Sequence, residues 1–264
     1  ASSGLLSVAQ ELLDERSGEI GNLSKQYYPL FMAAANDHLD LARLLLQSGA
    51  DVNRPEEKTG LPEGQGTTAI NVASYKGNTE MVRFLLDNGA DPTIVDGYEV
   101  TPLFMASQEG HEAIVVMLLD ALGSLPHADV HRADEDGVMP LFKAAQNGHA
   151  TVVKLLLDRG ADVNAQDHDG EGALHNATEA GENAVAVCTT LLARGANIAL
   201  ADNEGLTPLH RAVSADDAAA VALLLRHGGD AAAEDAEGKT PLQMLDEDSD
   251  HAEAICSLFN APPN

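Results

Sequence analysis

The stretch around position 168 is where the sequence comes closest to a set of side chains that could do chemistry. It reads Asp167-His168-Asp169-Gly170-Glu171, and carboxylate and imidazole groups this close together could bind a divalent cation. A calcium loop, however, places its oxygen ligands at alternating positions and closes them with a distant Glu, and this stretch lacks that spacing. Because an Asp-Gly pair among polar residues is typical of a tight turn, we interpret the stretch as a turn and expect no metal there.

The chain contains ten histidines and two cysteines, which could in principle support acid–base or nucleophilic chemistry. The sequence holds no P-loop, G-x-S-x-G, H-E-x-x-H or paired CxxC motif. Cys188 has no neighbouring base in the sequence that would activate its thiol. We therefore expect a protein that is not an enzyme, with no catalytic residues, no cofactor and no metal.

The elements that must position these residues are clearest in residues 137–169. Pro140 suits the first position of a helix, and Gly148 suits its end. A second helix follows, apolar on most sides, and Gly160 ends it before a short polar loop. Two such helices cannot bury their own apolar faces, so the unit needs similar units stacked on both sides.

Similar units occur almost from end to end. The apolar residue that follows the proline position marks each one: Leu30, Ile70, Leu103, Leu141, Leu174, Leu209 and Leu242. The markers are separated by 33 to 40 residues, with 33 as the base period. A fixed period of this length indicates a repeat protein in which each unit contacts only its neighbours.

Three motifs give the repeat a family resemblance. They are Thr207-Pro208-Leu209-His210, Gly148-His149, and the run 155–164, which reads LLLDRGADVN. The repeats resemble the ankyrin repeat over residues 25–260, about nine-tenths of the chain. The resemblance implies an all-α ankyrin-repeat solenoid, with a helix-turn-helix and a β-turn or hairpin loop in each repeat. It also explains His175 and His210 as structural, hydrogen-bonding residues.

The predicted domain organisation is a capping helix or half-repeat at 1–24, followed by an ankyrin domain at 25–264. We expect repeats to start near residues 25, 64, 97, 137, 170, 205 and 238, the last being a C-terminal cap. Residues 54–65 and 121–131 are insertions. Glu99 stands where the family usually has glycine, so the sequence leaves the geometry of that turn open. Repeat five lacks both the Thr and the Pro of the motif, so we expect it to be the least stable inner repeat.

Charge narrows the range of partners. The chain has 42 acidic and 15 basic residues, a net charge of −27. This charge disfavours nucleic acid and anionic membranes, and no apolar run is long enough to span a bilayer. It favours a protein partner with a basic surface, although acidity that serves only solubility or adaptation to a salty interior remains an alternative.

Localisation is predicted from the cysteines and the N-terminus. Cys188 and Cys256 lie two repeats apart, too far for a disulfide, which favours a reducing intracellular compartment: the cytoplasm, with the nucleus also open. The first residues lack the features of a signal peptide, and a leader that has been removed remains an alternative.

The ankyrin resemblance implies that partners contact the loop tips and the inner face of the first helices. The residues at those positions are Tyr75, Tyr98, Glu109, Glu135, Asp136, Val138, Gln146, His168, Asp169, Glu171, Asn203, Glu204, Leu206 and Glu237. The tips between Asp134 and Glu237 form a ladder of carboxylates. We expect this edge to bind a basic, extended segment, with Tyr98, Val138 and Leu206 as exposed apolar anchors.

The predicted function is a non-catalytic protein-interaction module or adaptor that acts as a monomer. One alternative is an acidic chaperone or nucleic-acid mimic that shields a basic protein. Another is a structural subunit that docks through the two insertions. Turns rich in Asp and Asn for conformational reasons alone would leave the acidic edge without a partner.

Overall fold

The computed structural model describes residues 29–56, 66–124, 130–246 and 248–260. The chain divides into two compact units, Ala1–Asp129 (unit 1) and Val130–Asn264 (unit 2). Every regular element in the described ranges is helical, and one isolated antiparallel bridge joins Gln166 to Gly172. This confirms the all-α prediction. The predicted cap at 1–24 lies outside the described residues.

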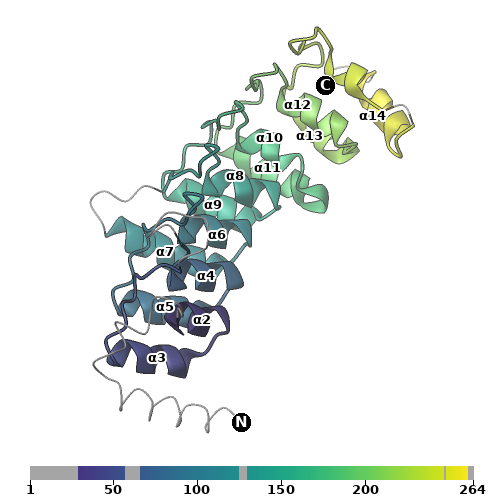
Figure 1. Ribbon diagram of the computed structural model, residues 1–264. Helices are drawn as coiled ribbons and strands as arrows, with labels where there is room; N and C mark the ends of the chain where they lie inside the picture. The colour runs from purple at the N-terminus through teal and green to yellow at the C-terminus, as the bar shows by residue number, and fades with distance from the viewer. Residues whose placement is uncertain (1–28, 57–65, 125–129, 247, 261–264) are drawn as a thin grey trace. The chain divides into compact units, whose positions relative to one another are not determined.

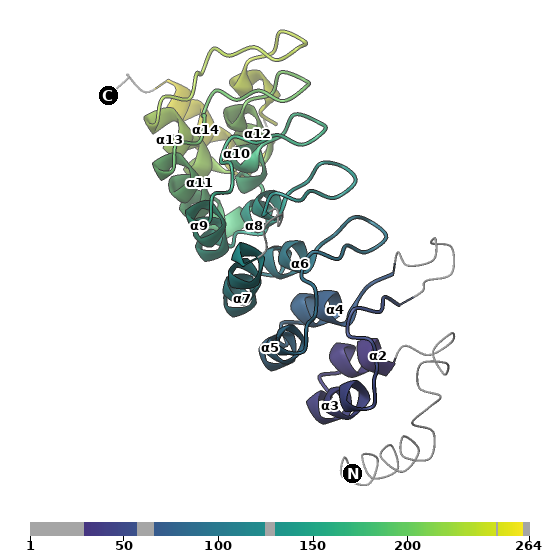
Figure 2. The ribbon, with the colours of Figure 1, turned by 90° about the vertical axis from the view of Figure 1, so that its left-hand side faces the viewer.

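The described residues of unit 1 form three helix pairs, which Figures 1 and 2 show in purple to teal. The pairs are α2 (Pro29–Ala35) with α3 (Leu39–Gln47), α4 (Ala69–Lys76) with α5 (Thr79–Asp87), and α6 (Pro102–Gln108) with α7 (Glu112–Gly123). The first helices pack in order, α2 on α4 and α4 on α6, and α5 packs on α7. Part of the insertion at 121–131 lengthens α7, and residues 125–129 lie outside the described ranges.

Unit 2 continues the same pattern with four pairs. They are α8 (Pro140–Gln146) with α9 (Ala150–Asp158), α10 (Ala173–Ala177) with the 3-10 turn η2 (Gly181–Asn183) and α11 (Ala184–Ala193), α12 (Pro208–Ser214) with α13 (Ala218–Arg226), and the 3-10 turn η3 (Pro241–Met244) with α14 (Ala252–Phe259). The shortened first element of the last pair is the main departure from the regular repeat.

Small side chains let the two helices of each pair approach closely. Ala33, Ala73, Ala106, Ala144 and Ala212 are all fully buried at one position of the first helix. Larger apolar side chains on the second helices, such as Leu85, Leu118 and Leu156, fill the space against the neighbouring repeats and are also fully buried. Each unit therefore holds one continuous apolar core.

The third position of the first helix carries hydrogen bonds from one repeat to the next. The His175 ring donates from Nε2 to the Leu206 carbonyl at 3.0 Å and accepts the Gly172 N–H at Nδ1, at 3.1 Å. His210 makes the same pair of bonds, to the Lys239 carbonyl at 3.2 Å and from the Thr207 N–H at 3.0 Å. Because Nδ1 accepts, the proton must be on Nε2. The prediction of structural histidines is confirmed.

Repeat five is also better capped than its sequence indicates. Gly172 has no side chain to cap α10, yet its own N–H is bonded by His175 Nδ1. Unit 1 uses threonine at this point: the Thr101 hydroxyl accepts the Phe104 N–H at 3.1 Å. The low stability expected for repeat five stays a prediction, with this bond as a compensation.

The turn at Glu99 keeps the repeat geometry, which the sequence leaves open. Glu99 has φ +59°, in the same left-handed region as Gly137 at +82° and Gly170 at +80°. The Asp96 N–H still bonds to the Val100 carbonyl at 3.0 Å, as it does in the glycine turns. A side chain in this conformation costs about 1 kcal/mol, which the surrounding hydrogen bonds offset.

A polar clasp joins the last helix pair to the one before it. Asp216 accepts the Ser249 hydroxyl at 2.7 Å and lies 3.0 Å from His251 Nδ1. The hydrogen bond to Asp216 raises the pKa of His251, and the Ser249 and His251 bonds lower the pKa of Asp216. The predicted polar C-terminal cap is thus held by charge and hydrogen bonds in addition to apolar contacts.

Candidate functional site

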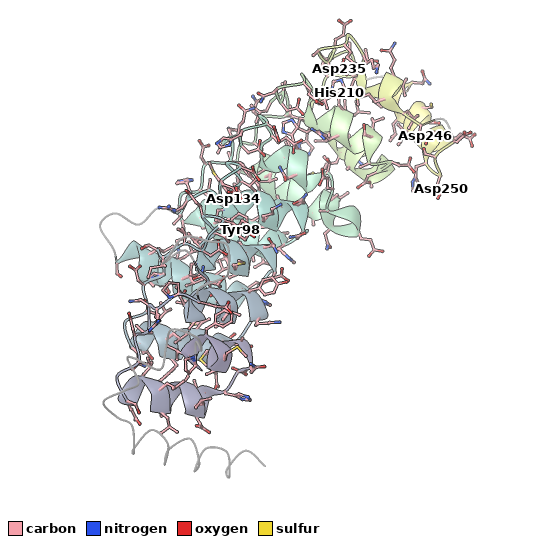
Figure 3. All side chains as sticks on the ribbon, in the orientation of Figure 1. Tyr98, Asp134, His210, Asp235, Asp246 and Asp250 are labelled. Carbon is pink, nitrogen blue, oxygen red and sulfur yellow. The ribbon has the colours of Figure 1, made fainter. Side chains whose placement is uncertain are left out.

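The turns that lead into α6, α8, α10, α12 and η3 each use one aspartate in the same way. Its carboxylate accepts the backbone N–H groups two and four residues later, at 2.8–3.1 Å in every turn. The residues are Asp96, Asp134, Asp167, Asp202 and Asp235, of which Figure 3 labels Asp134 and Asp235. The carboxylate oxygens that make these bonds shape the turn, so this part of the predicted ladder has the conformational role considered as an alternative.

The turns of unit 2 are joined to one another through their backbones. The Asp136 carbonyl accepts the His168 N–H at 3.2 Å, the Asp169 carbonyl accepts the Asn203 N–H at 2.9 Å, and the Glu204 carbonyl accepts the Ala236 N–H at 2.8 Å. The Asn203 side chain also donates to the His168 carbonyl at 2.9 Å. These bonds make the turns of unit 2 one continuous edge.

Glycine is required where adjacent turns of this edge meet. Gly170 has φ +80°, and a Cβ at this position would lie 2.8 Å from the Asn203 backbone nitrogen. Asn203 therefore packs against the preceding turn through its backbone and is also part of the exposed edge. The close approach explains why the next turn can bond directly to the Asp169 carbonyl.

Most of the predicted tip residues in unit 2 are exposed. They are Glu135, Asp136, His168, Asp169, Asn203, Glu204 and Glu237, whereas Val138 is half-buried. Glu237 forms an ion pair with Lys239 at 2.7 Å. Exposed pairs of this kind are worth little, so Glu237 keeps most of its hydration and its availability to a partner.

Leu206 is not an exposed anchor, which corrects the prediction. It is 6% exposed, its N–H is bound by Asp202 at 2.8 Å, and its carbonyl accepts the proton of His175 Nε2. The chain turns inward after Gly205, and Val100 is buried at the corresponding place of its turn, whereas the charged Lys239 is exposed there. An apolar residue that recurs at this position is thus part of the core.

Glu171 is occupied by an internal ion cluster. Its carboxylate pairs with the Arg211 guanidinium, which also binds Asp202 at 2.9 Å. Partial burial raises the pKa of Glu171, Asp167 and other carboxylates raise it further, and Arg211 opposes them. Burial alone would lower the pKa of Arg211, but the Asp202 hydrogen bond and the Glu171 charge outweigh it and raise the pKa.

The predicted residues on the inner helix face differ between the units. Tyr75 is 42% exposed at the end of α4, and Glu109 is exposed after α6. In unit 2, Gln146 donates to Glu179 at 2.7 Å and accepts from Lys143 at 3.0 Å. Gln146 is therefore half-buried in a polar network and is less available than its position indicates.

Several residues of this face were missed from sequence. Met32, Val72 and Met105 share the fourth position of α2, α4 and α6, and Met32 is 54% exposed. Arg211 holds the same position in α12. Aligning the fourth residue of these helices would have found them, because it is apolar in α2, α4 and α6 and polar or charged in α8, α10 and α12.

Metal binding and thiol chemistry have little structural support in the described ranges. No group of three His, Cys, Asp or Glu side chains there could hold a metal ion. Cys188 and Cys256 are both free, and burial raises the pKa of the Cys188 thiol to about 12. A thiol with so high a pKa is unreactive at neutral pH. None of the described helices is both long and apolar enough to cross a membrane.

Family models match nearly all of the described chain. A model described as ankyrin repeats in three copies matches residues 103–202 and 174–262. A second, described as ankyrin repeats in many copies, matches residues 30–86 and 70–119. Together these matches extend over both units.

Two solved structures share the fold. The human ASB11 ankyrin repeat domain is 26% identical, with a TM-score of 0.75, and the match covers 90% of this chain and all of that one. The Bcl-3 ankyrin repeat domain is 24% identical, with a TM-score of 0.69, and the match covers 89% and 99% of the two chains.

Curated relatives match over shorter stretches. An ankyrin repeat, SAM and basic leucine zipper domain-containing protein of Microcebus murinus is 33% identical over 120 residues, 44% of this chain and 24% of that protein. The potassium channel AKT1 of Arabidopsis thaliana is 36% identical over 90 residues, 34% of this chain and 10% of the channel. The chain thus spans about a quarter or less of the length of these relatives.

Proposed function

The chain belongs to the ankyrin-repeat family, and we propose that it is a non-catalytic adaptor that binds a basic, extended segment of another protein along the turns of unit 2. Ankyrin repeats are general protein-interaction modules, and the family is typically non-catalytic. What we add to this general role is that the partner segment is basic and that it binds along the turns of unit 2.

The exposed carboxylates of the edge carry the proposal. Glu135, Asp136, Asp169 and Glu204 are exposed in three successive turns, and backbone hydrogen bonds join these turns into one edge. Like charges repeated along one edge make a continuous negative potential, which attracts a basic chain and speeds its association. The turn-forming aspartates support this edge, whose free charge comes from the neighbouring residues.

Burial of Leu206 and pairing of Glu171 favour a second candidate function. Without Leu206 and with Val138 half-buried, unit 2 offers few apolar anchors along this edge. Binding there would depend mainly on charge, as in an acidic chaperone or nucleic-acid mimic that shields a basic protein. Salt separates the two functions, because a charge-driven shield weakens steeply with ionic strength and an adaptor with apolar anchors weakens less.

The remaining features of the proposal follow from charge and cysteine chemistry. A net charge of −27 excludes direct nucleic-acid and membrane binding from the proposal. Free Cys188 and Cys256 support a reducing intracellular location, the cytoplasm or the nucleus. We propose that the chain acts as a monomer. Docking through the insertions at 54–65 and 121–131 falls largely on residues outside the described ranges.

The test is binding of a 15-residue Lys/Arg-rich, Gly/Ser-spaced peptide, measured by calorimetry at low and physiological salt. The tip variant removes four charges: Glu135→Gln, Asp136→Asn, Asp169→Asn and Glu204→Gln. Four exposed pairs worth about 0.2–1 kcal/mol each predict a loss of roughly fivefold to several hundredfold in affinity at low salt. The control variant removes four charges elsewhere: Asp40→Asn, Glu80→Gln, Glu112→Gln and Glu253→Gln.

Equal binding by the parent, the tip variant and the control variant would overturn the acidic-edge proposal. Equal weakening of both variants would mean that net charge alone attracts the peptide. Binding by the parent that survives physiological salt favours the adaptor, and binding confined to low salt favours the shield.

A further inference from the structure

Exposed apolar side chains gather in unit 1. Across the described residues, four large apolar side chains are exposed: Met32, Tyr75, Tyr98 and Val185. Met32 and Tyr75 lie on the adjacent helices α2 and α4, and Tyr98 lies in the turn that leads into α6. Single exposed apolar residues are ordinary, but three on adjoining elements indicate an interaction surface.

The first helices of unit 1 arrange apolar side chains in a row. Met32, Val72 and Met105 occupy the same position of α2, α4 and α6, which pack side by side. Tyr75 lies three residues after Val72, one turn further along the same face of α4. Packed helices are about 8–10 Å apart, so the row repeats at about that distance.

One flank of this row carries charges of opposite sign. Lys76 ends α4, and Glu109 follows α6 at the equivalent position, and both side chains are exposed. The Lys76 ammonium lies 5.9 Å from the Tyr75 ring centroid, and Glu109 accepts a hydrogen bond from Gln108 at 2.9 Å. A partner that lies across the row therefore meets a positive charge at one repeat and a negative charge at the next.

We propose that this face of α2, α4 and α6 binds an amphipathic helix of a partner protein. Seven residues of a helix span about 10.5 Å, slightly more than the spacing of about 8–10 Å between the helices of the row. Methionine adapts to varied apolar surfaces, and a tyrosine at the centre is a typical anchor. A polyproline segment needs a groove lined by aromatic rings, whereas this row offers methionine and valine with a single tyrosine.

The partner helix has a defined pattern. Apolar residues at i, i+7 and i+14 contact Met32, Val72 with Tyr75, and Met105. On the flank, an acidic residue faces Lys76 and a basic residue seven positions along faces Glu109. The charges thus fix the direction in which the helix lies across the three repeats. This surface shares no residue with the acidic edge of unit 2, so either proposal can fail without the other.

The experiment selects binders to the full chain from two peptide display libraries, one of 21-residue helices and one of unstructured segments. The expected result is enrichment of helices with apolar residues at seven-residue intervals. Tyr75→Ser should lower the affinity of the selected helices by about tenfold or more, as for a central tyrosine anchor. Val185→Ser removes another exposed apolar side chain, 36% exposed against 42% for Tyr75, from α11 and should leave the affinity unchanged.

A charge exchange tests the direction of binding. The double variant Lys76→Glu with Glu109→Lys should weaken the selected helix, and exchanging its own acidic and basic residues should restore the binding. The absence of binders, enrichment of unstructured segments alone, or binders unaffected by Tyr75→Ser would each overturn the proposal. Circular dichroism should be unchanged in Tyr75→Ser, because Tyr75 is 42% exposed near the end of α4.

Discussion

The first helices of unit 1 and unit 2 follow one repeat but present different chemistry at the same position. At the fourth residue, unit 1 has Met32, Val72 and Met105, whereas unit 2 has Lys143, Asn176 and Arg211. In unit 1, Met32 is exposed and Val72 and Met105 are half-buried, whereas the cations of unit 2 are bound to Gln146, or to Glu171 with Asp202.

The turns of the two units also differ at one position. Unit 1 uses Glu99 where the turns of unit 2 use glycine, yet both adopt a left-handed backbone. The comparison teaches that the repeat requires a backbone conformation, a small buried residue and a bridging side chain at fixed places. The other positions are free to differ, and the two units have used that freedom for different surfaces.

The largest expected effect concerns the bridge between repeats. Phe142 holds in α8 the position that His175 holds in α10. His175→Phe would leave the Gly172 N–H and the Leu206 carbonyl buried without partners, because Gly172 has no side chain to take over. The expected loss is about 2–4 kcal/mol in the free energy of unfolding, measured by urea denaturation.

His175→Asn is the matched control for this bridge. Asn71 makes the equivalent bond in unit 1, donating to the Val100 carbonyl at 3.1 Å, so asparagine should preserve part of the stability. If the phenylalanine variant were as stable as the asparagine variant, the bridge would not be what supports repeat five.

The same residue predicts a pH dependence for unit 2. Burial lowers the pKa of His175 from its ordinary value of 6.5, so the folded state holds the neutral ring. Its contribution is complete above pH 6.5 and is lost as the pH falls toward the lower folded value. His175→Asn should flatten the stability between pH 7 and pH 5 relative to the parent chain, and an identical pH profile would contradict this account.

A smaller effect is expected at the ion cluster of unit 2. Arg211→Met places at this position the apolar residue type that Met32 and Met105 have in unit 1. The change leaves Asp202, whose side chain is 2% exposed, without its cation. We expect a loss of about 2–3 kcal/mol, less than for a fully buried pair because Arg211 is partly exposed. Arg194→Met breaks the pair with Asp158, whose side chain is 45% exposed, and should cost less than about 1 kcal/mol. Equal losses in the two variants would show that the Asp202 cluster contributes no more to stability than the exposed pair does.

The smallest expected effect concerns the left-handed residue of the turns. Glu99→Gly gives unit 1 the residue found in unit 2 and relieves a left-handed side chain. Removing the strain raises the free energy of unfolding by about 1 kcal/mol. The greater conformational freedom of glycine in the unfolded chain cancels part of this increase. A net stabilisation of roughly 0.5 kcal/mol should appear in urea unfolding, and a loss would mean that Glu99 contributes contacts that outweigh its strain.

Sequence reasoning predicted the fold well, because the glycines, the small residues and the apolar positions recur at a fixed period. It predicted the structural roles of His175 and His210 from the same recurrence. It failed at Leu206, since a pattern of polar tips does not show where the chain turns inward. It also failed at Glu171, whose partner Arg211 is 40 positions away in the sequence and lies beside it only through repeat stacking.

Hydrogen exchange of the full chain, with and without the 15-residue basic peptide at low salt, tests the central claim most directly. The acidic edge of unit 2 should gain protection in the turns at 134–138, 167–171 and 202–206. The turn of unit 1 at 96–100 should exchange as before, because Tyr98 stands where unit 2 has Asp136, Asp169 and Glu204, which leaves Glu99 as the exposed carboxylate of this turn. Protection confined to unit 1, or spread evenly over both units, would contradict the assignment of the basic segment to this edge.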